Sequence, residues 1–65
     1  MRIVLNGAEN VTDVSTVEAL VAELGLKRGT VLVEHNGTAL RPDEWAQTSV
    51  SEGDRVEILR IVAGG

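Results

Sequence analysis

The sequence predicts an α+β domain in which one main helix packs on one face of a mixed five-stranded sheet. Two runs of alternating apolar residues are each interrupted by an Asn-Gly pair, Asn6-Gly7 and Asn36-Gly37. This dipeptide is preferred in two-residue hairpin turns because both positions need positive φ. One amphipathic helix is expected between the two hairpins, and one apolar strand follows the second hairpin after a crossover. The helix supplies the second layer that the apolar face of the sheet requires.

The first hairpin is expected in RIVLNGAENVTDV, with Ile3 and Leu5 pointing to one face, and the helix in STVEALVAELGL. Ser15 and Glu18 have the spacing of a capping box, in which the serine hydroxyl accepts from the N3 amide and the glutamate accepts from the cap amide. An apolar stripe at helical spacing comprises Val17, Leu20, Val21 and Leu24. Gly25 is expected to end the helix in the left-handed conformation.

The second half of the chain repeats the pattern. TVLVEHNGTAL is the second hairpin, with Val31 and Val33 on one face. RPDEWAQT is excluded as a central strand because Pro42 lacks a backbone donor, so we expect a short helical turn or an irregular crossover. Trp45 is interpreted as a core residue beneath this crossover rather than a recognition anchor. RVEILRIV is the last strand, and placing it between the two hairpins gives a β-grasp, or ubiquitin-like, architecture.

The composition argues against several classes of function. The net charge is −4 and Trp45 is the only aromatic residue, so the chain lacks the positive charge and stacking rings of a nucleic-acid-binding protein. It contains no cysteine, so we expect neither a disulfide nor a thiolate metal site. No apolar run has the length of a membrane span, and the N-terminus does not resemble a signal peptide. We therefore expect a cytoplasmic protein that does not bind membranes.

Candidate catalytic and metal-binding residues are few. His35 is the only histidine and lies beside a hairpin turn, so we interpret it as a polar residue at a strand end rather than a metal ligand or general base. The acidic pairs at positions 43–44 and 52 and 54 lie in polar turns, where such clusters usually face solvent. No serine has a histidine positioned by sequence to activate it. We expect no enzyme active site, no bound metal and no bound cofactor.

The phase of the last strand predicts a surface for partner docking. If Val56 and Ile58 face the helix, Leu59 and Ile61 face the open side of the sheet, where polar residues are usual. Val4 extends the same face from the first strand. Exposed apolar patches of this kind often mark partner surfaces. The alternative is that the strand end tucks under the crossover, and the sequence leaves both arrangements open.

Residues 1–62 are expected to form the domain, and residues 63–65 a flexible tail. Ala63 and Gly64 are small enough to thread a narrow channel that excludes larger side chains. Gly65 then presents an unshielded terminal carboxylate to the active site of a partner. The alternative is an ordinary frayed terminus.

The sequence resembles the ThiS-type sulfur carriers of thiamin biosynthesis, within the ubiquitin-like ThiS/MoaD family. The resemblance covers nearly the whole chain and is carried by MRIVLNGAE, TVEALVAELGL, VEHNGTALRPDEWAQT and EGDRVEILRIVAGG. Its most specific parts are EW at positions 44–45, EGD at 52–54 and the terminal Gly-Gly. Ala63 departs from the third glycine of many members. The small subunits of molybdopterin synthase share this fold and tail but are usually longer.

The resemblance implies that Gly65 is the one residue that reacts. An E1-like (ThiF-like) adenylating enzyme uses ATP to activate its carboxylate, a persulfide supplies sulfur, and the resulting thiocarboxylate donates it to a thiazole synthase (ThiG-like). The implied protein is a cosubstrate without its own active site, and we expect a free monomer. Strand phase adds Leu59 and Ile61 as docking residues. A molybdopterin-type carrier and a non-covalent ubiquitin-like interaction module remain the alternatives.

Overall fold

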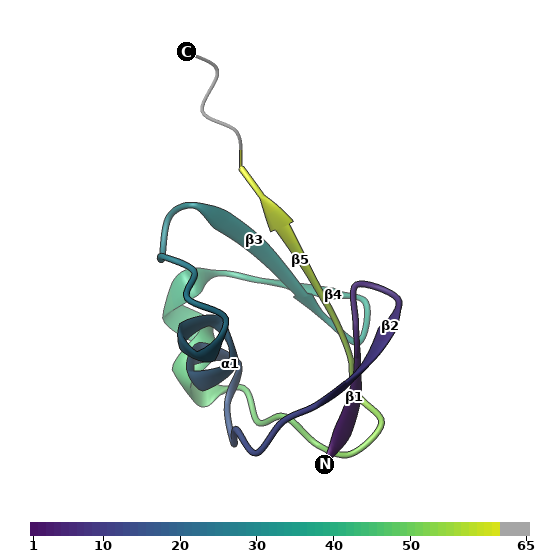
Figure 1. Ribbon diagram of the computed structural model, residues 1–65. Helices are drawn as coiled ribbons and strands as arrows, with labels where there is room; N and C mark the ends of the chain where they lie inside the picture. The colour runs from purple at the N-terminus through teal and green to yellow at the C-terminus, as the bar shows by residue number, and fades with distance from the viewer. Residues whose placement is uncertain (62–65) are drawn as a thin grey trace.

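The computed structural model describes residues 1–61, and its elements follow the expected order (Figure 1). The expected tail at 63–65 and Val62 lie outside the described residues. The strands and helices are β1 (Arg2–Leu5), β2 (Ala8–Val11), α1 (Val17–Glu23), β3 (Val31–His35), β4 (Thr38–Leu40), the 3-10 helix η1 (Pro42–Gln47) and β5 (Arg55–Arg60).

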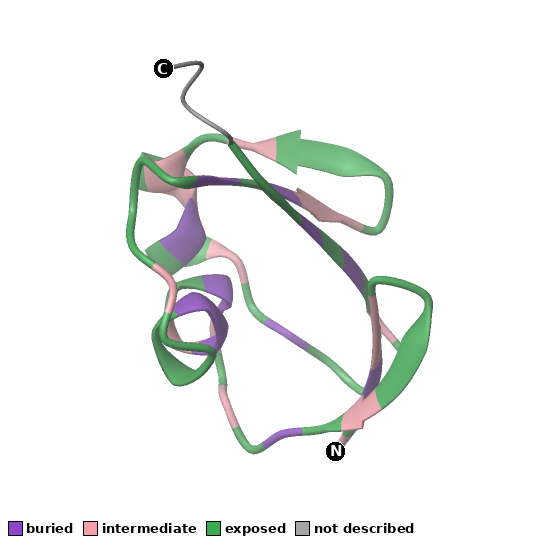
Figure 2. Cartoon of the chain, turned by 45° about the horizontal axis from the view of Figure 1, so that its top comes forward, coloured by how far each residue is buried: buried purple, intermediate pink, exposed green. Residues whose placement is uncertain are grey.

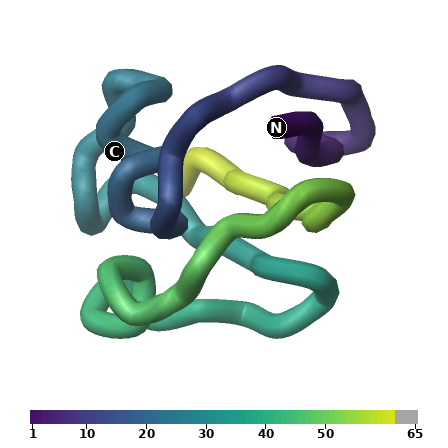
Figure 3. The backbone as a smooth tube through the Cα atoms, turned by 90° about the horizontal axis from the view of Figure 1, so that it is seen from below, coloured from purple at the N-terminus to yellow at the C-terminus, as the bar shows by residue number. Residues whose placement is uncertain are grey.

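The sheet has five strands in the order β2-β1-β5-β3-β4, so β5 lies between the two hairpins as expected (Figure 3). β5 pairs in parallel with β1, where Val4 is opposite Arg55, and antiparallel with β3, where Val33 is opposite Ile58. Helix α1 and η1 lie on the same side of this mixed sheet (Figure 1). The predicted β-grasp arrangement is confirmed.

Both hairpin turns have the backbone conformation that their Asn-Gly pairs predict. Asn6 and Gly7 have φ values of 49° and 81°, and Asn36 and Gly37 have 50° and 85°. Two successive residues with positive φ define a type I′ turn, whose twist matches that of the strands it joins. The local sequence therefore sets the lengths of both hairpins.

The hydrophobic core lies between the sheet and the helical layer (Figure 2). Ten apolar residues of the described part of the chain are buried there: Ile3, Val17, Leu20, Val21, Val31, Val33, Trp45, Val50, Val56 and Ile58. Leu5 packs against this cluster, so it shares a face with Ile3 as expected. The core is built from β-branched and aliphatic side chains, with one aromatic residue.

The predicted start of α1 is wrong by one residue. Thr16 is the N-cap, and its hydroxyl accepts a hydrogen bond from the Ala19 N–H at 3.1 Å. The predicted capping box of Ser15 and Glu18 does not form. Thr16 and Ser49 form an antiparallel bridge, which keeps the chain extended up to Thr16 and delays the first helical residue. Position N3 is then an alanine, which has no side chain to complete a box.

The end of α1 is as expected. Gly25 has a φ of 72°, its N–H donates to Ala22 O at 3.0 Å, and the Leu26 N–H donates to Val21 O at 3.1 Å. This pair of bonds is a Schellman motif, and it satisfies carbonyl groups that the helix end would leave unpaired. The motif turns the chain towards β3.

The crossover contains a short helix that places Trp45 in the core. The Arg41 N–H donates to Glu44 Oε1 at 2.7 Å at the start of η1, and Pro42 occupies the first helical position. Trp45 is 3% exposed, which confirms that it is a core residue rather than a surface anchor. In residues 1–61, no helix has the length and hydropathy needed to cross a membrane.

Candidate functional site

The end of β5 presents apolar side chains on the face of the sheet that α1 does not cover. Val56 and Ile58 are buried against the helical layer. Leu59 is 56% exposed and Ile61 is 45% exposed, on the opposite face. The alternation along the strand therefore has the predicted phase, and the strand end does not tuck under the crossover. The Ile61 N–H donates to Thr30 O at 2.8 Å, so the chain remains attached to the sheet up to this residue.

Leu32 lies beside these two residues and was not among the predicted docking residues. It is 58% exposed and lies directly opposite Leu59 in the antiparallel pairing of β3 and β5. Side chains at such opposed positions are about 5 Å apart and contact each other. The sequence did contain a signal for its exposure: Val31 and Val33 share the face that is buried, so Leu32 between them must point to the open face. We call Leu32, Leu59 and Ile61 the open-face patch.

Val4 does not belong to the open-face patch. It is half-buried and lies opposite Arg55, four residues before Leu59 on β5. At about 3.3 Å per residue, this places Val4 roughly 13 Å from Leu59 along the sheet. The parallel register of β1 and β5 brings Val4 to the start of β5 rather than to its end. Val4 thus shares the open face but lies at the start of β5 rather than beside Leu59 and Ile61, and its docking role stays a prediction.

The start of β5 is held by a polar cluster. His35 Nε2 and Asp54 Oδ2 are 2.7 Å apart, and the Ser51 N–H donates to Asp54 Oδ2 at 2.8 Å. The Asn36 amide donates to Asp54 Oδ1 at 3.2 Å, and its Oδ1 accepts from the Arg55 N–H at 2.8 Å. These bonds tie the second hairpin turn to the turn that precedes β5. His35 is thus engaged at a strand end by Asp54.

The environment of Asp54 favours its charged form. Burial alone raises the pKa of Asp54, but the hydrogen bonds that its carboxylate accepts, first from His35, outweigh burial and hold the pKa below 3.8. The carboxylate is therefore a permanent acceptor at neutral pH rather than a proton donor. No group of three or more potential metal ligands occurs among residues 1–61. The cluster acts as a structural clamp on β5.

The predicted reactive segment follows the open-face patch in the sequence. Ala63, Gly64 and Gly65 lie outside the described residues, so their predicted roles are not tested by the structure. The structure describes the chain as far as Ile61, just before this segment. They put an exposed apolar surface at the end of β5, next to the point where the described chain leaves the sheet.

Comparison with solved structures identifies close structural similarity over the whole chain. The crystal structure of the thiamine biosynthesis protein ThiS from Geobacter metallireducens has a TM-score of 0.84 and 32% identity, and the match covers 100% of both chains. The NMR structure of a thiamine biosynthesis protein from the same organism has a TM-score of 0.81 and 32% identity. That match covers 100% of this chain and 88% of the other.

Sequence comparison gives a consistent result. A thiazole synthase of Paramagnetospirillum magneticum is 41% identical over 66 residues, a match that covers 100% of this chain and 20% of that protein. The chain thus spans about a fifth of the length of this curated relative. The family model for ThiS matches residues 3–65, which include both terminal glycines. The chain therefore belongs to the ThiS family, whose solved members named above share its β-grasp fold.

Proposed function

We propose that this protein carries sulfur as a thiocarboxylate on Gly65 and delivers it for thiazole formation in thiamin biosynthesis. The observation that carries the proposal is the match of the ThiS family model through Gly65. The open-face patch supports it, because a carrier needs a docking surface close to the residue that its partners modify. In this proposal the protein is a cosubstrate, and its partners supply the catalytic groups.

The chemistry at Gly65 follows from the poor reactivity of a carboxylate. Its negative charge repels nucleophiles, and oxide is a poor leaving group. An adenylating enzyme transfers AMP from ATP to a carboxylate oxygen and releases pyrophosphate, which gives an acyl-adenylate. A persulfide sulfur attacks the acyl carbon and AMP leaves, forming an acyl disulfide. A thiol then reduces the sulfur–sulfur bond and releases the thiocarboxylate.

The proposed partners are an adenylating enzyme, a persulfide donor and a thiazole synthase. The similarity to one stretch of a thiazole synthase supports the last of these, because that protein contains a segment like this chain within its own length. It also favours a thiazole product over molybdopterin as the destination of the sulfur. Leu59 and Ile61 are the proposed docking residues, with Leu32 beside them. Ala63 and Gly64 are proposed to thread the channel to the active site.

The first prediction concerns Gly65. Deletion of Gly65 abolishes sulfur loading and leaves the fold intact, because residue 65 lies beyond the last described strand. The measurement is intact-protein mass spectrometry after incubation with ATP, the adenylating enzyme and a persulfide, scored as exchange of one oxygen for sulfur. Fragmentation localises the exchange, and thermal unfolding of the truncated chain is the control. Unimpaired loading of the truncated chain contradicts the proposal and favours a non-covalent interaction module.

A further inference from the structure

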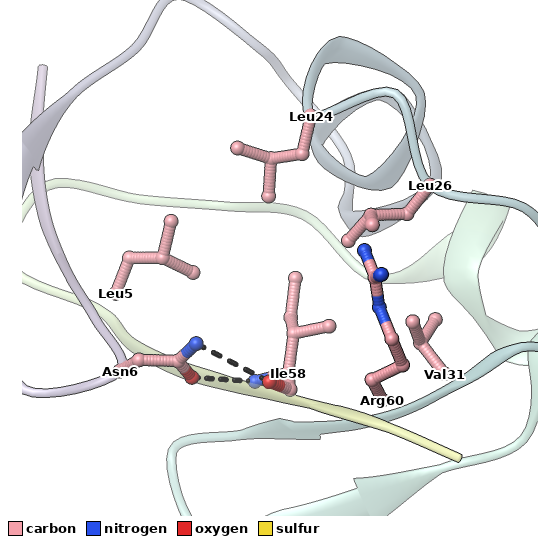
Figure 4. A pocket seen from close by; sticks show the side chains of 7 residues that line it. All are labelled: Leu5, Asn6, Leu24, Leu26, Val31, Ile58 and Arg60. Atoms are coloured by element: carbon pink, nitrogen blue, oxygen red, sulfur yellow. Dashed lines mark hydrogen bonds between the residues drawn. The ribbon is translucent and has the colours of Figure 1, made fainter. Parts of the chain in front are cut away.

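An apolar pocket opens beside the end of β5, on the face of the sheet opposite the open-face patch (Figure 4). Its volume is about 320 Å³. Leu5, Leu24 and Ile58 contribute to its apolar walls, and Arg60 crosses it with the guanidinium directed towards Leu26 (Figure 4). Leu24 is 37% exposed although it belongs to the apolar stripe of α1. The domain therefore leaves part of this stripe without cover.

The pocket lies where β1 stops pairing with β5. The last paired residues are Leu5 and Val56, and Asn6 then enters the hairpin turn. The Asn6 side chain continues the pairing by one step: its Oδ1 accepts from the Ile58 N–H at 2.7 Å, and its Nδ2 donates to Ile58 O at 3.2 Å (Figure 4). The Asn6 side-chain amide thus bonds the backbone groups of Ile58 that no strand residue of the described chain reaches on this side.

Arg60 occupies the next position on the same edge. The N–H and C=O groups of a strand residue in an antiparallel pair point to one side, and they alternate sides from residue to residue. The Ile61 N–H points to β3, where it donates to Thr30 O, and Val56 O points to β1, where it accepts from the Asn6 N–H. The backbone groups of Arg60 therefore point to the β1 side. No strand among residues 1–61 is paired with Arg60 on that side.

The charged side chains that line this edge, Arg60 and Lys27, are both cations. Arg60 also lines an adjacent hollow together with Lys27, and no carboxylate lines either the hollow or the pocket. Within residues 1–61, neither cation forms an ion pair. A protein with a net charge of −4 thus has a local positive region at the end of β5. An acidic side chain on a partner is complementary to it.

We propose that an extended segment of the thiazole synthase pairs with the free edge of β5 at Arg60. An apolar side chain of this segment fills the pocket, and an acidic side chain two residues away contacts Arg60, because alternate residues of a strand share a face. Addition of a strand to an unpaired edge supplies backbone hydrogen bonds, and a neighbouring pocket supplies specificity. The identity of the partner rests on the proposed function.

The direct test is hydrogen exchange at two adjacent amides. In the ¹⁵N-labelled chain bound to thiazole synthase, the Arg60 amide is expected to exchange at least about tenfold more slowly than in the free chain, because it gains a hydrogen bond. The Ile61 amide, already bonded to Thr30, is the internal control. Unchanged exchange at Arg60 in a saturated complex overturns the proposal. Protection that appears in the free chain at high concentration assigns the edge to a second copy and also overturns it.

A pair of variants tests the pocket. Leu24→Lys places a cation in the pocket and is expected to raise the Kd for thiazole synthase about tenfold or more, because it removes apolar burial and the ammonium group would have to lose its hydration when the partner's apolar side chain enters. Val11→Lys is the matched control, because Val11 is 70% exposed on the edge strand β2, and its Kd is expected to stay within about twofold of that of the wild type. Thermal unfolding checks that both variants fold.

The outcomes separate this inference from the proposed function. Equal affinity of folded Leu24→Lys and wild-type chains contradicts the pocket assignment. Absence of any binding between the wild-type chain and thiazole synthase also overturns the inference, as does Arg60 protection by the adenylating enzyme instead. Sulfur loading of Gly65 is measured without thiazole synthase, so its failure counts against the proposed function alone.

Discussion

The two ends of β5 are built from different chemistry. At its start, the Asp54 carboxylate accepts hydrogen bonds from three groups, so the polar atoms are satisfied within the domain. At its end, Leu59 and Ile61 are exposed, and no layer formed by residues 1–61 covers them. The first arrangement stabilises the fold, whereas the second leaves apolar area available to a partner. Groups that stabilise the fold and groups available for recognition therefore lie at separate ends of one strand and can be altered separately.

The largest expected effect is on binding at the apolar end. Leu59→Asp is expected to weaken binding to the adenylating enzyme by about 30-fold or more, since a charge at the centre of a desolvated contact costs about 2 kcal/mol or more. Its thermal unfolding is expected to change little because Leu59 is exposed. Titration calorimetry measures the affinity, with Val11→Asp as the control on a distant strand. Wild-type affinity of Leu59→Asp excludes the open-face patch as the docking surface.

The next effect is on stability at the polar end. Asp54→Ala removes an acceptor from three donors and is expected to lower the free energy of unfolding by about 2 kcal/mol. Urea denaturation measures this loss. Glu57→Ala is the matched control on the same strand, because Glu57 is exposed and the loss there is expected to stay below about 0.5 kcal/mol. Equal losses in the two variants are inconsistent with a structural role for the cluster.

A smaller effect is the acid sensitivity of the same cluster. The pKa of Asp54 in the folded state is below the ordinary value of 3.8. The ionised carboxylate therefore contributes stability that is fully present above its unfolded-state pKa and is lost as the pH falls through the lower, folded-state pKa. We expect the difference in unfolding free energy between wild type and Asp54→Asn to shrink as the pH is lowered through this window. A difference that is constant with pH contradicts the assignment.

The smallest expected effect concerns Val4, which shares the open face but lies at the polar end. Val4→Thr is expected to change the affinity for the adenylating enzyme by less than about threefold, which is about 0.6 kcal/mol. The same calorimetric titration used for Leu59→Asp measures it. A loss comparable to that of Leu59→Asp would show that the docking surface extends along the whole strand.

Most of the fold could be predicted because its signals are local. The two Asn-Gly turns depend on the φ preferences of their own residues, and the end of α1 depends on Gly25. The exposure of Leu59 followed from alternation along one strand. Leu32 was missed because its importance depends on the register between β3 and β5, which brings it opposite Leu59. The position of Val4 along this face depends on register in the same way, because the parallel pairing of β1 with β5 places Val4 opposite Arg55.

The sequence by itself determined the order of the elements, the turn types and the phase of each strand, because these depend on backbone preferences and on a period of two residues. The tertiary structure decided which residues meet. Thr16 replaces Ser15 as the helix cap because the chain before α1 pairs with Ser49, which lies far along the sequence. The Asn6 side chain bonds Ile58 only because β1 ends beside it. Contacts between distant segments depend on register and packing, which no short stretch of sequence encodes.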